Sequence, residues 1–388
     1  MFNGNRGLII IFLILLISGI SGTAGAGWEI EYVDENCYYK HWFPHRCLWV
    51  SPEDHYLLAT GGDRLRLYYY DQNEWTETVL VEHMVYDVSM AVTDMNNIHI
   101  CYYDTWQDSV NYISNSGGEW DIHTIKQYKE GRSEEGQHSV ACDSQGKPWI
   151  ILNRGRLYLF EKISQDQWDY KIINPDSDTY DARYPSLAFD SKDHLHIGFE
   201  CEDQSTLDMT VRYGYFDGES WEFEDIIEPY FNSIHTSVAV TEDDKIGIAV
   251  YLDLENSAVK NNVLMYAEKT AEGWQTDMVD IIKHLTKSVY RVTVCLEFDS
   301  AGSPCIAYGQ SGTGPVIYAC KSSDEWCFDN LDGINASFAC TSLDFDSQDR
   351  PVISFLSKLD KRLKTAVKGD AATWEILTVD KEERNIAD

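Results

Sequence analysis

The chain has 388 residues, enough for one large domain or two ordinary ones, and 13% of them are aromatic while 24% are charged. An apolar content of 44% is too high for a disordered chain, and the aromatic enrichment favours β-strands. The net charge of −33 excludes nucleic acid and anionic membrane surfaces as partners, because their phosphates repel an acidic protein.

The start of the chain has the pattern of a secretory signal peptide. Arg6 precedes the unbroken apolar run 8–17, and a stretch of small residues follows and closes on Ala26. This order is typical of a signal cleaved after Ala26, and the run is shorter than the roughly 20 residues of a membrane span. An uncleaved anchor is the alternative. We therefore expect a secreted, extracellular protein with a signal peptide (1–26) and a single domain (27–388).

Beyond this segment, tryptophans mark an internal repeat with a period of roughly 50 residues. Between them a second block recurs seven times, as in 186–199 and 342–355, and each copy is typical of a hairpin with a tight polar turn. A third strand and a tryptophan strand complete each repeat. Four short strands per repeat predict an all-β, seven-bladed β-propeller with four-stranded antiparallel blades. The repeating tryptophans are Trp28, Trp75, Trp120, Trp168, Trp221, Trp274, Trp326 and Trp374.

Alignment of the seven blocks assigns roles to positions of the innermost strands. The first position is always small, which relieves crowding at the axis, and the next is always apolar and should fill the space between blades. The extra strand at Trp28 is predicted to pair with the last blade and close the ring, either replacing or flanking the Trp374 strand. The first positions are Cys47, Ser89, Ser139, Ser186, Ser237, Cys295 and Ser342.

The repeat Asp-Ser-x-x-x-x-His-Ile-x-Phe at 190–199, followed by a turn and a tryptophan strand, resembles secreted sialidase-like (BNR-type) propellers. The resemblance covers nearly all of 28–380 and implies the propeller fold, in a superfamily of enzymes, lectin-like binders and surface proteins. Catalytic sialidases carry three pocket arginines, a tyrosine nucleophile paired with a glutamate, an acid/base aspartate and an Arg-Ile-Pro segment. This chain has no Arg-Ile-Pro, and its turns before tryptophan, such as 71–75, match the aspartate box only loosely. No catalytic residue carries over.

Ligands of propellers usually meet the face formed by the blade-to-blade connections and by the loops after the second strands. Acid, imidazole, guanidinium and phenol groups gathered there can bind a sugar or a peptide, while solvated rim residues are the alternative. The candidates are Asp87, Tyr184, His235 and Arg291 at the starts of inner strands, and Asp104, Asn153 and Glu200 after second strands.

Glu297 and Asp344 occupy one aligned position in neighbouring inner strands, where the other copies have alanine or tryptophan. Two carboxylates near the axis can share a proton, bind a cation or act as acid and base. A water-lined channel or a hydrogen-bonded contact between blades is the alternative.

The remaining polar residues favour structural roles. His99 and His196 hold one aligned position and should be packing elements of the repeat, and no spacing predicts a metal site. The turn aspartates have the composition of calcium ligands, but capping of their own backbone explains them, so no cofactor is predicted and calcium is the alternative. Cys320 and Cys327 flank a predicted hairpin turn and form the one suggested disulfide.

Together these patterns predict a monomeric extracellular binding module that takes a glycan or a protein ligand on its loop face. The alternative is a sialidase-like glycoside hydrolase. Convergence of Arg46, Arg183 and Arg291 beside a tyrosine–glutamate pair would favour the enzyme.

Overall fold

The computed structural model describes most of the chain after its first 46 residues. The described ranges are 47–128, 137–153, 155–164, 167–173, 180–203, 209–230, 232–253, 261–283, 293–309, 315–331, 337–357, 362–369 and 373–379. The predicted signal peptide, the Trp28 strand, Arg46 and Arg291 lie outside these ranges.

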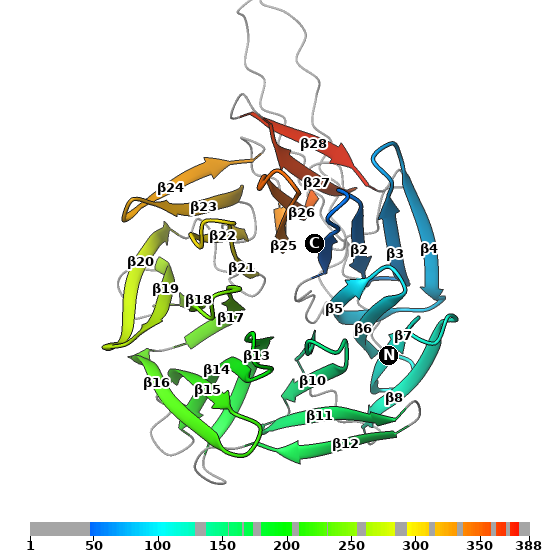
Figure 1. Ribbon diagram of the computed structural model, residues 1–388, viewed down its shortest axis with the longest axis horizontal. Helices are drawn as coiled ribbons and strands as arrows, with labels where there is room; N and C mark the ends of the chain where they lie inside the picture. Colours follow the sequence, from blue (N-terminus) through cyan, green and yellow to red (C-terminus); the bar gives the residue numbers. More distant parts are fainter. Residues whose placement is uncertain are drawn as a thin grey trace, which may run out of the picture. The chain divides into compact units, whose positions relative to one another are not determined.

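The described strands form seven four-stranded antiparallel sheets arranged in a ring (Figure 1). In every sheet, neighbouring strands are consecutive in sequence, and the first strand lies innermost. The predicted seven-bladed propeller is therefore confirmed. No helix occurs in the described ranges, and hence none there is long and apolar enough to span a membrane.

The strands divide in chain order into blades 1 to 7, four to a blade. Blade 1 comprises β1 (Leu48–Val50), β2 (Tyr56–Thr60), β3 (Leu65–Tyr70) and β4 (Trp75–Val81), and blade 2 comprises β5 (Val85–Asp94), β6 (Asn97–Asp104), β7 (Ser109–Ser114) and β8 (Asp121–Gln127). Blade 3 comprises β9 (His138–Cys142), β10 (Pro148–Asn153), β11 (Leu157–Ser164) and β12 (Gln167–Ile172), and blade 4 comprises β13 (Tyr180–Phe189), β14 (Leu195–Asp203), β15 (Met209–Phe216) and β16 (Trp221–Tyr230). Blade 5 comprises β17 (Asn232–Val240), β18 (Ile246–Asp253), β19 (Asn261–Thr270) and β20 (Gly273–Lys283), and blade 6 comprises β21 (Val294–Phe298), β22 (Pro304–Gly309), β23 (Val316–Ser322) and β24 (Glu325–Asn330). Blade 7 comprises β25 (Ser337–Phe345), β26 (Pro351–Ser357), β27 (Arg362–Lys368) and β28 (Trp374–Thr378).

The small residue that opens an inner block joins neighbouring blades in several copies, at contacts that we call seams. Ser342 Oγ of blade 7 accepts the backbone N–H of Leu48 of blade 1 at 3.2 Å, which closes the ring. A serine hydroxyl fits here because it is small and can accept a buried amide that would otherwise lack a partner. The same bond recurs at three other seams: Ser89 with Val140 at 2.8 Å, Ser186 with Val238 at 3.1 Å, and Ser237 with Leu296 at 3.1 Å.

Four of the repeating tryptophans contact a tyrosine across a seam, which accounts for their period. Trp168 on the outermost strand of blade 3 meets Tyr112 of blade 2 edge to face, with ring centroids 4.9 Å apart. Such pairs stabilise beyond the area they bury. Equivalent pairs join the later blades: Tyr213 with Trp274, Tyr266 with Trp326, and Tyr318 with Trp374.

The apolar core likewise crosses the seams. One cluster combines Cys101 and Tyr112 of blade 2 with Val140 and Ile150 of blade 3, so the apolar second position of the inner block fills space between blades as predicted. A second cluster spans blades 7, 1 and 2 and includes Val352.

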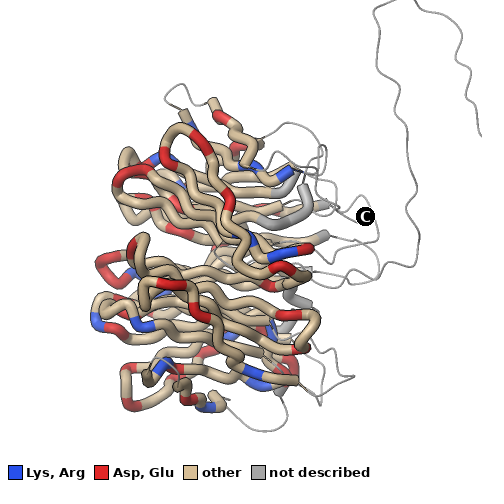
Figure 2. The backbone as a smooth tube through the Cα atoms, turned by 90° about the vertical axis from the view of Figure 1, so that its right-hand side faces the viewer, with Lys and Arg blue, Asp and Glu red and all other residues tan. Residues whose placement is uncertain are grey.

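Acidic residues outnumber basic ones along the described backbone (Figure 2).

The predicted Cys320–Cys327 disulfide is wrong. Cys320 bonds Cys305, and Cys327 is an exposed free thiol. The register explains the error, because Cys320 of β23 lies directly opposite Cys327 of β24 and also directly opposite Cys305 of β22. Hairpin spacing in the sequence indicates only the first of these two neighbours.

Candidate functional site

Two inner strands carry the same bulge at the same place on the loop face, the face at which inner strands begin and second strands end. The register of β5 shifts between Tyr86 and Ser89, and that of β13 shifts in the same way after Arg183. The bulged residues Asp87 and Tyr184 have φ angles of 51° and 49°. Residues with side chains are strained in this left-handed region, and such bulges re-aim side chains near functional sites.

Tyr184 is the centre of a polar cluster drawn from three neighbouring blades. Gln137 Oε1 of blade 3 accepts the Tyr184 N–H at 2.6 Å and lies 3.5 Å from Asn153 Nδ2. On the other side, the ring centroid of His235 of blade 5 is 6.5 Å from that of Tyr184. Asn153 and His235 are buried, with exposed fractions of 6% and 1%. The cluster therefore holds Tyr184, a residue of intermediate burial, on buried supports.

Two buried carboxylates help to raise the pKa of this phenol. Burial first, then the charges of Glu200 and Asp87, raise the pKa of Tyr184 to about 12, so its hydroxyl stays protonated and can donate a hydrogen bond. Glu200 and Asp87 are both buried. Burial lowers the pKa of His235 to about 3, so this imidazole is neutral. The structure thus brings four predicted residues together around the phenol of a fifth, Tyr184.

Charged groups that a ligand can reach lie on the same strands. The Arg183 side chain is 36% exposed and binds Asp181 at 3.1 Å and also Glu202 on the neighbouring strand β14. A guanidinium fork flanked by two carboxylates offers donors and acceptors to sugar hydroxyls. A ligand on this face meets Arg183 and Tyr184 before it meets the buried members of the cluster.

Asp104 lies on the loop face of blade 2, where it organises a turn. Its Oδ2 binds His83 Nε2 at 2.8 Å, and its Oδ1 accepts the N–H groups of Trp106 and Gln107 at 2.9 and 3.0 Å. Trp106 is 76% exposed and stacks on His83 with ring centroids 4.6 Å apart. Sequence reasoning missed this residue. Its signal is that Trp106 falls outside the tryptophan repeat, in a polar turn.

Glu297 and Asp344 lie further along their inner strands, β21 and β25, toward the opposite face. Asp344 Oδ2 accepts the N–H of Val50 of blade 1 at 2.7 Å. This bond corresponds to the predicted alternative of a contact between blades. Whether the two carboxylates act together in binding stays a prediction.

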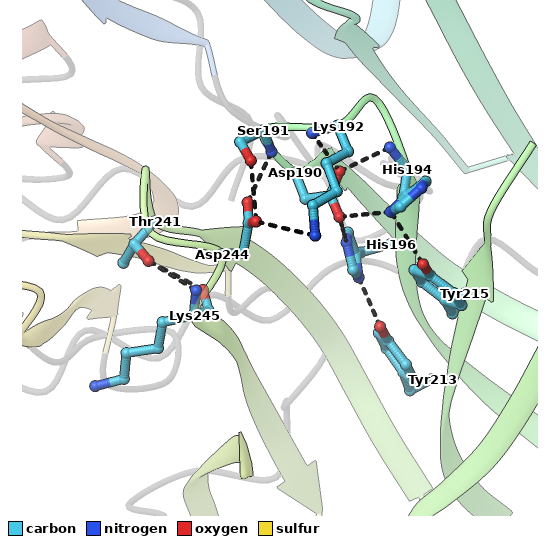
Figure 3. A network of polar contacts seen from close by, with 10 residues as sticks. All are labelled: Asp190, Ser191, Lys192, His194, His196, Tyr213, Tyr215, Thr241, Asp244 and Lys245. Carbon is cyan, nitrogen blue, oxygen red and sulfur yellow. Dashed lines mark hydrogen bonds and ion pairs between the residues drawn. The ribbon is translucent and has the colours of Figure 1, made fainter. Parts of the chain in front are cut away.

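The aligned histidines are packing elements, as predicted. His99 Nδ1 lies 2.5 Å from the Tyr112 hydroxyl, and His196 Nδ1 lies 2.6 Å from the Tyr213 hydroxyl (Figure 3). His194 and His196 both contact Asp190 Oδ2, at 2.9 and 3.4 Å.

The turn aspartates cap their own turns, as Asp190 Oδ1 does by accepting the Lys192 N–H at 2.9 Å. Within the described ranges, the one cluster of metal-ligating groups at suitable spacing is Asp299 with Cys305 and Cys320. The disulfide between the two cysteines removes both thiolates as ligands.

On the opposite face, a cleft of about 340 Å³ opens at the seam between blades 5 and 6. Its charged side chains are largely paired with one another: Lys245 lies 3.0 Å from Glu268, and Lys321 lies 2.6 Å from Asp277.

Known structures share the fold at low sequence identity. A polysaccharide lyase of an ulvan lyase family has a TM-score of 0.53 at 10% identity, with 87% of this chain and 92% of that chain covered. A lyase of this family bound to -[GlcA(1-4)Rha3S]- has a TM-score of 0.50 at 12% identity, covering 74% and 81%. A triple arginine-to-alanine mutant of AofleA from Arthrobotrys oligospora has a TM-score of 0.50 at 9% identity, covering 76% and 88%.

No protein-family model matches the chain, and no curated protein matches it. The structural likenesses therefore establish the propeller architecture and no sequence family.

Proposed function

We propose that this protein is an extracellular glycan-binding propeller whose loop face holds the ligand around Tyr184. The observation that carries the proposal is the cluster itself, in which Asn153, Glu200 and His235 surround the half-buried Tyr184 beside the Arg183 fork. Few, well-oriented polar groups on rigid strands are typical of ligand sites.

Two further observations support this function. The fold is one on which carbohydrate is accommodated, since an ulvan lyase propeller was solved with an oligosaccharide bound. The net charge of −33 favours neutral or basic sugars over uronates and sulfates, because like charges repel at close range.

The test is a glycan array probed with the mature protein, residues 27–388, and with matched variants. We expect Arg183→Ala and Tyr184→Phe to lose at least about tenfold in affinity, equivalent to about 1.4 kcal/mol. Arg350→Ala is the control, because Arg350 is a comparably exposed arginine, paired with Asp346 on the opposite face. An array on which the wild type binds no glycan, or on which all variants bind alike, contradicts the proposal. Binding to an extracellular protein instead would also contradict it.

A glycoside hydrolase is the second candidate, favoured by the closeness of Tyr184 and Glu200. The raised pKa of Tyr184, about 12, works against it, because a phenol must lose its proton to act as a nucleophile. The measurement is hydrolysis of a fluorogenic sialoside by the wild type and by Tyr184→Phe. Turnover that the substitution abolishes would establish the enzyme.

A further inference from the structure

Among the described tryptophans, Trp106 alone is exposed, at 76% of its surface. It lies in the turn between β6 and β7 on the loop face, whereas four of the repeating tryptophans pack against tyrosines of neighbouring blades. An indole left in water forgoes the burial that stabilises the others. Its position therefore calls for an explanation other than packing.

The exposed indole ring is held in place by His83 and by the hydrogen bonds of the turn that carries it. His83 stacks on it at an interplanar angle of 12°, and the buried Asp104 binds both His83 and the backbone of the turn. Thr105 Oγ1 donates to the Met84 carbonyl at 2.8 Å, which ties the turn to the connection between blades 1 and 2. A ring fixed in this way presents its outer face without further ordering when a ligand binds.

Two exposed charged side chains lie beside the stacked His83. Glu82, next to His83 in sequence, pairs with Arg64 at 3.4 Å, and both side chains are exposed, at 74% and 44%. Through Glu82, this ion pair offers an acceptor and a donor next to His83, which stacks on Trp106. Burial first, then nearby charges that include those of Asp87 and Asp104, raise the pKa of Tyr103, so the turn that carries Trp106 lies near Asp87 of the cluster around Tyr184.

We propose that Trp106 is a stacking platform for one uncharged pyranose ring of the glycan, an inference that rests on the function proposed above. The negative face of the indole attracts the C–H bonds on the apolar face of a sugar, and the sugar's hydroxyls meet Glu82 and Arg64. A protein partner fits less well, because stable interfaces bury about 1,200 Å² or more. The acidic surface disfavours an anionic sugar.

The first test uses an array of neutral, amino-sugar, uronate and sulfated glycans. We expect the wild type to prefer neutral glycans, Trp106→Ala to lose about tenfold in affinity, and Trp106→Phe to lose less. His83→Ala should fall between wild type and Trp106→Ala, because it leaves the indole in place but unsupported. Phe328→Ala is the control, since Phe328 is an exposed aromatic residue on the outermost strand of blade 6 and should bind as the wild type does.

The second test needs no variant. N-bromosuccinimide oxidises exposed indoles, so the peptide carrying Trp106 is followed by mass spectrometry with and without the best neutral glycan from the array. Protection of Trp106 by the glycan supports the platform, and equal oxidation overturns it. If Trp106→Ala binds as the wild type does while Arg183→Ala does not, the platform is wrong and the proposed function stands. If the wild type binds no glycan, both are wrong.

Discussion

Ser191 of blade 4 donates two hydrogen bonds to the carboxylate of Asp244 of blade 5, from its backbone N–H at 2.8 Å and its hydroxyl at 2.9 Å (Figure 3). Asp244 has a φ of 66°, a conformation that favours glycine. The same clamp joins Ser144 to Asp193, Ser300 to Asp349, and Ser347 of the last blade to Asp54 of the first.

Other seams lack both partners of the clamp. Where Glu242 replaces the serine in blade 5, the next blade has Gly302 at the left-handed position, with a φ of 73°. Where Asp94 replaces it in blade 2, the next blade has Gly146, also with a φ of 73°. Aspartate therefore occupies the strained position where a serine lies across the seam, and glycine occupies it at these two seams.

Replacement of Asp244 should separate the clamp from the backbone strain. Asp244→Ala removes two charge-assisted bonds and keeps a side chain at positive φ, so we expect a loss of about 1–2 kcal/mol in the free energy of unfolding. Asp244→Gly removes the same bonds but relieves the strain, and should be about 1 kcal/mol more stable than Asp244→Ala. Urea unfolding measures both, and equal stability of the two variants would contradict this account.

A clamp can also be built where none exists. A β-carbon at Gly302 meets no atom within 4 Å, so Gly302→Asp is sterically free and should cost about 1 kcal/mol through backbone strain. Combined with Glu242→Ser, the new carboxylate gains a partner across the seam, and the double variant should recover most of that loss. A double-mutant cycle measures the coupling. The idea fails if the two substitutions are simply additive.

The ring was predictable because most seams repeat the same few contacts. The small first residue, the apolar second residue and the tryptophan each recur at one period, so seven copies reinforce one another. The site was less predictable, because its parts meet only in space. Gln137 and Tyr184 belong to different blades, and Trp106 gains its support from His83, which precedes the adjacent strand.

Acid should destabilise the protein through its buried histidines. Burial lowers the pKa of His99 from 6.5 to about 4, so the unfolded chain binds the proton more readily than the folded one. The stability that neutral His99 contributes is complete above pH 6.5 and falls as the pH drops toward 4. We expect a loss on the order of 1–2 kcal/mol at pH 5 relative to pH 7. Thermal melting of the wild type and His99→Phe at both pH values checks this, since the variant should show the smaller loss.

The bulge at Asp87 should lower the stability of the fold and strengthen glycan binding. Asp87→Gly and Asp87→Ala both remove the carboxylate, but only glycine relaxes the φ of 51°. We expect Asp87→Gly to be about 1 kcal/mol more stable than Asp87→Ala, and both to bind glycan more weakly than the wild type. Melting curves and array titrations on the two variants decide the matter. Undiminished binding in both would mean that the bulge is structural only.

Asp344 tests how the last blade holds the first. Its Oδ2 accepts the N–H of Val50, a buried residue of the three-residue strand β1, so Asp344→Ala leaves a buried amide without its acceptor. We expect Asp344→Ala to lose about 1–3 kcal/mol of stability, whereas Asp344→Asn, which keeps an oxygen at this place, should lose less. Glu297→Gln is measured beside them, because a purely structural carboxylate should leave glycan binding unchanged when it becomes an amide. Loss of binding in both Asp344→Asn and Glu297→Gln, with melting temperatures preserved, would instead make the two carboxylates a functional pair.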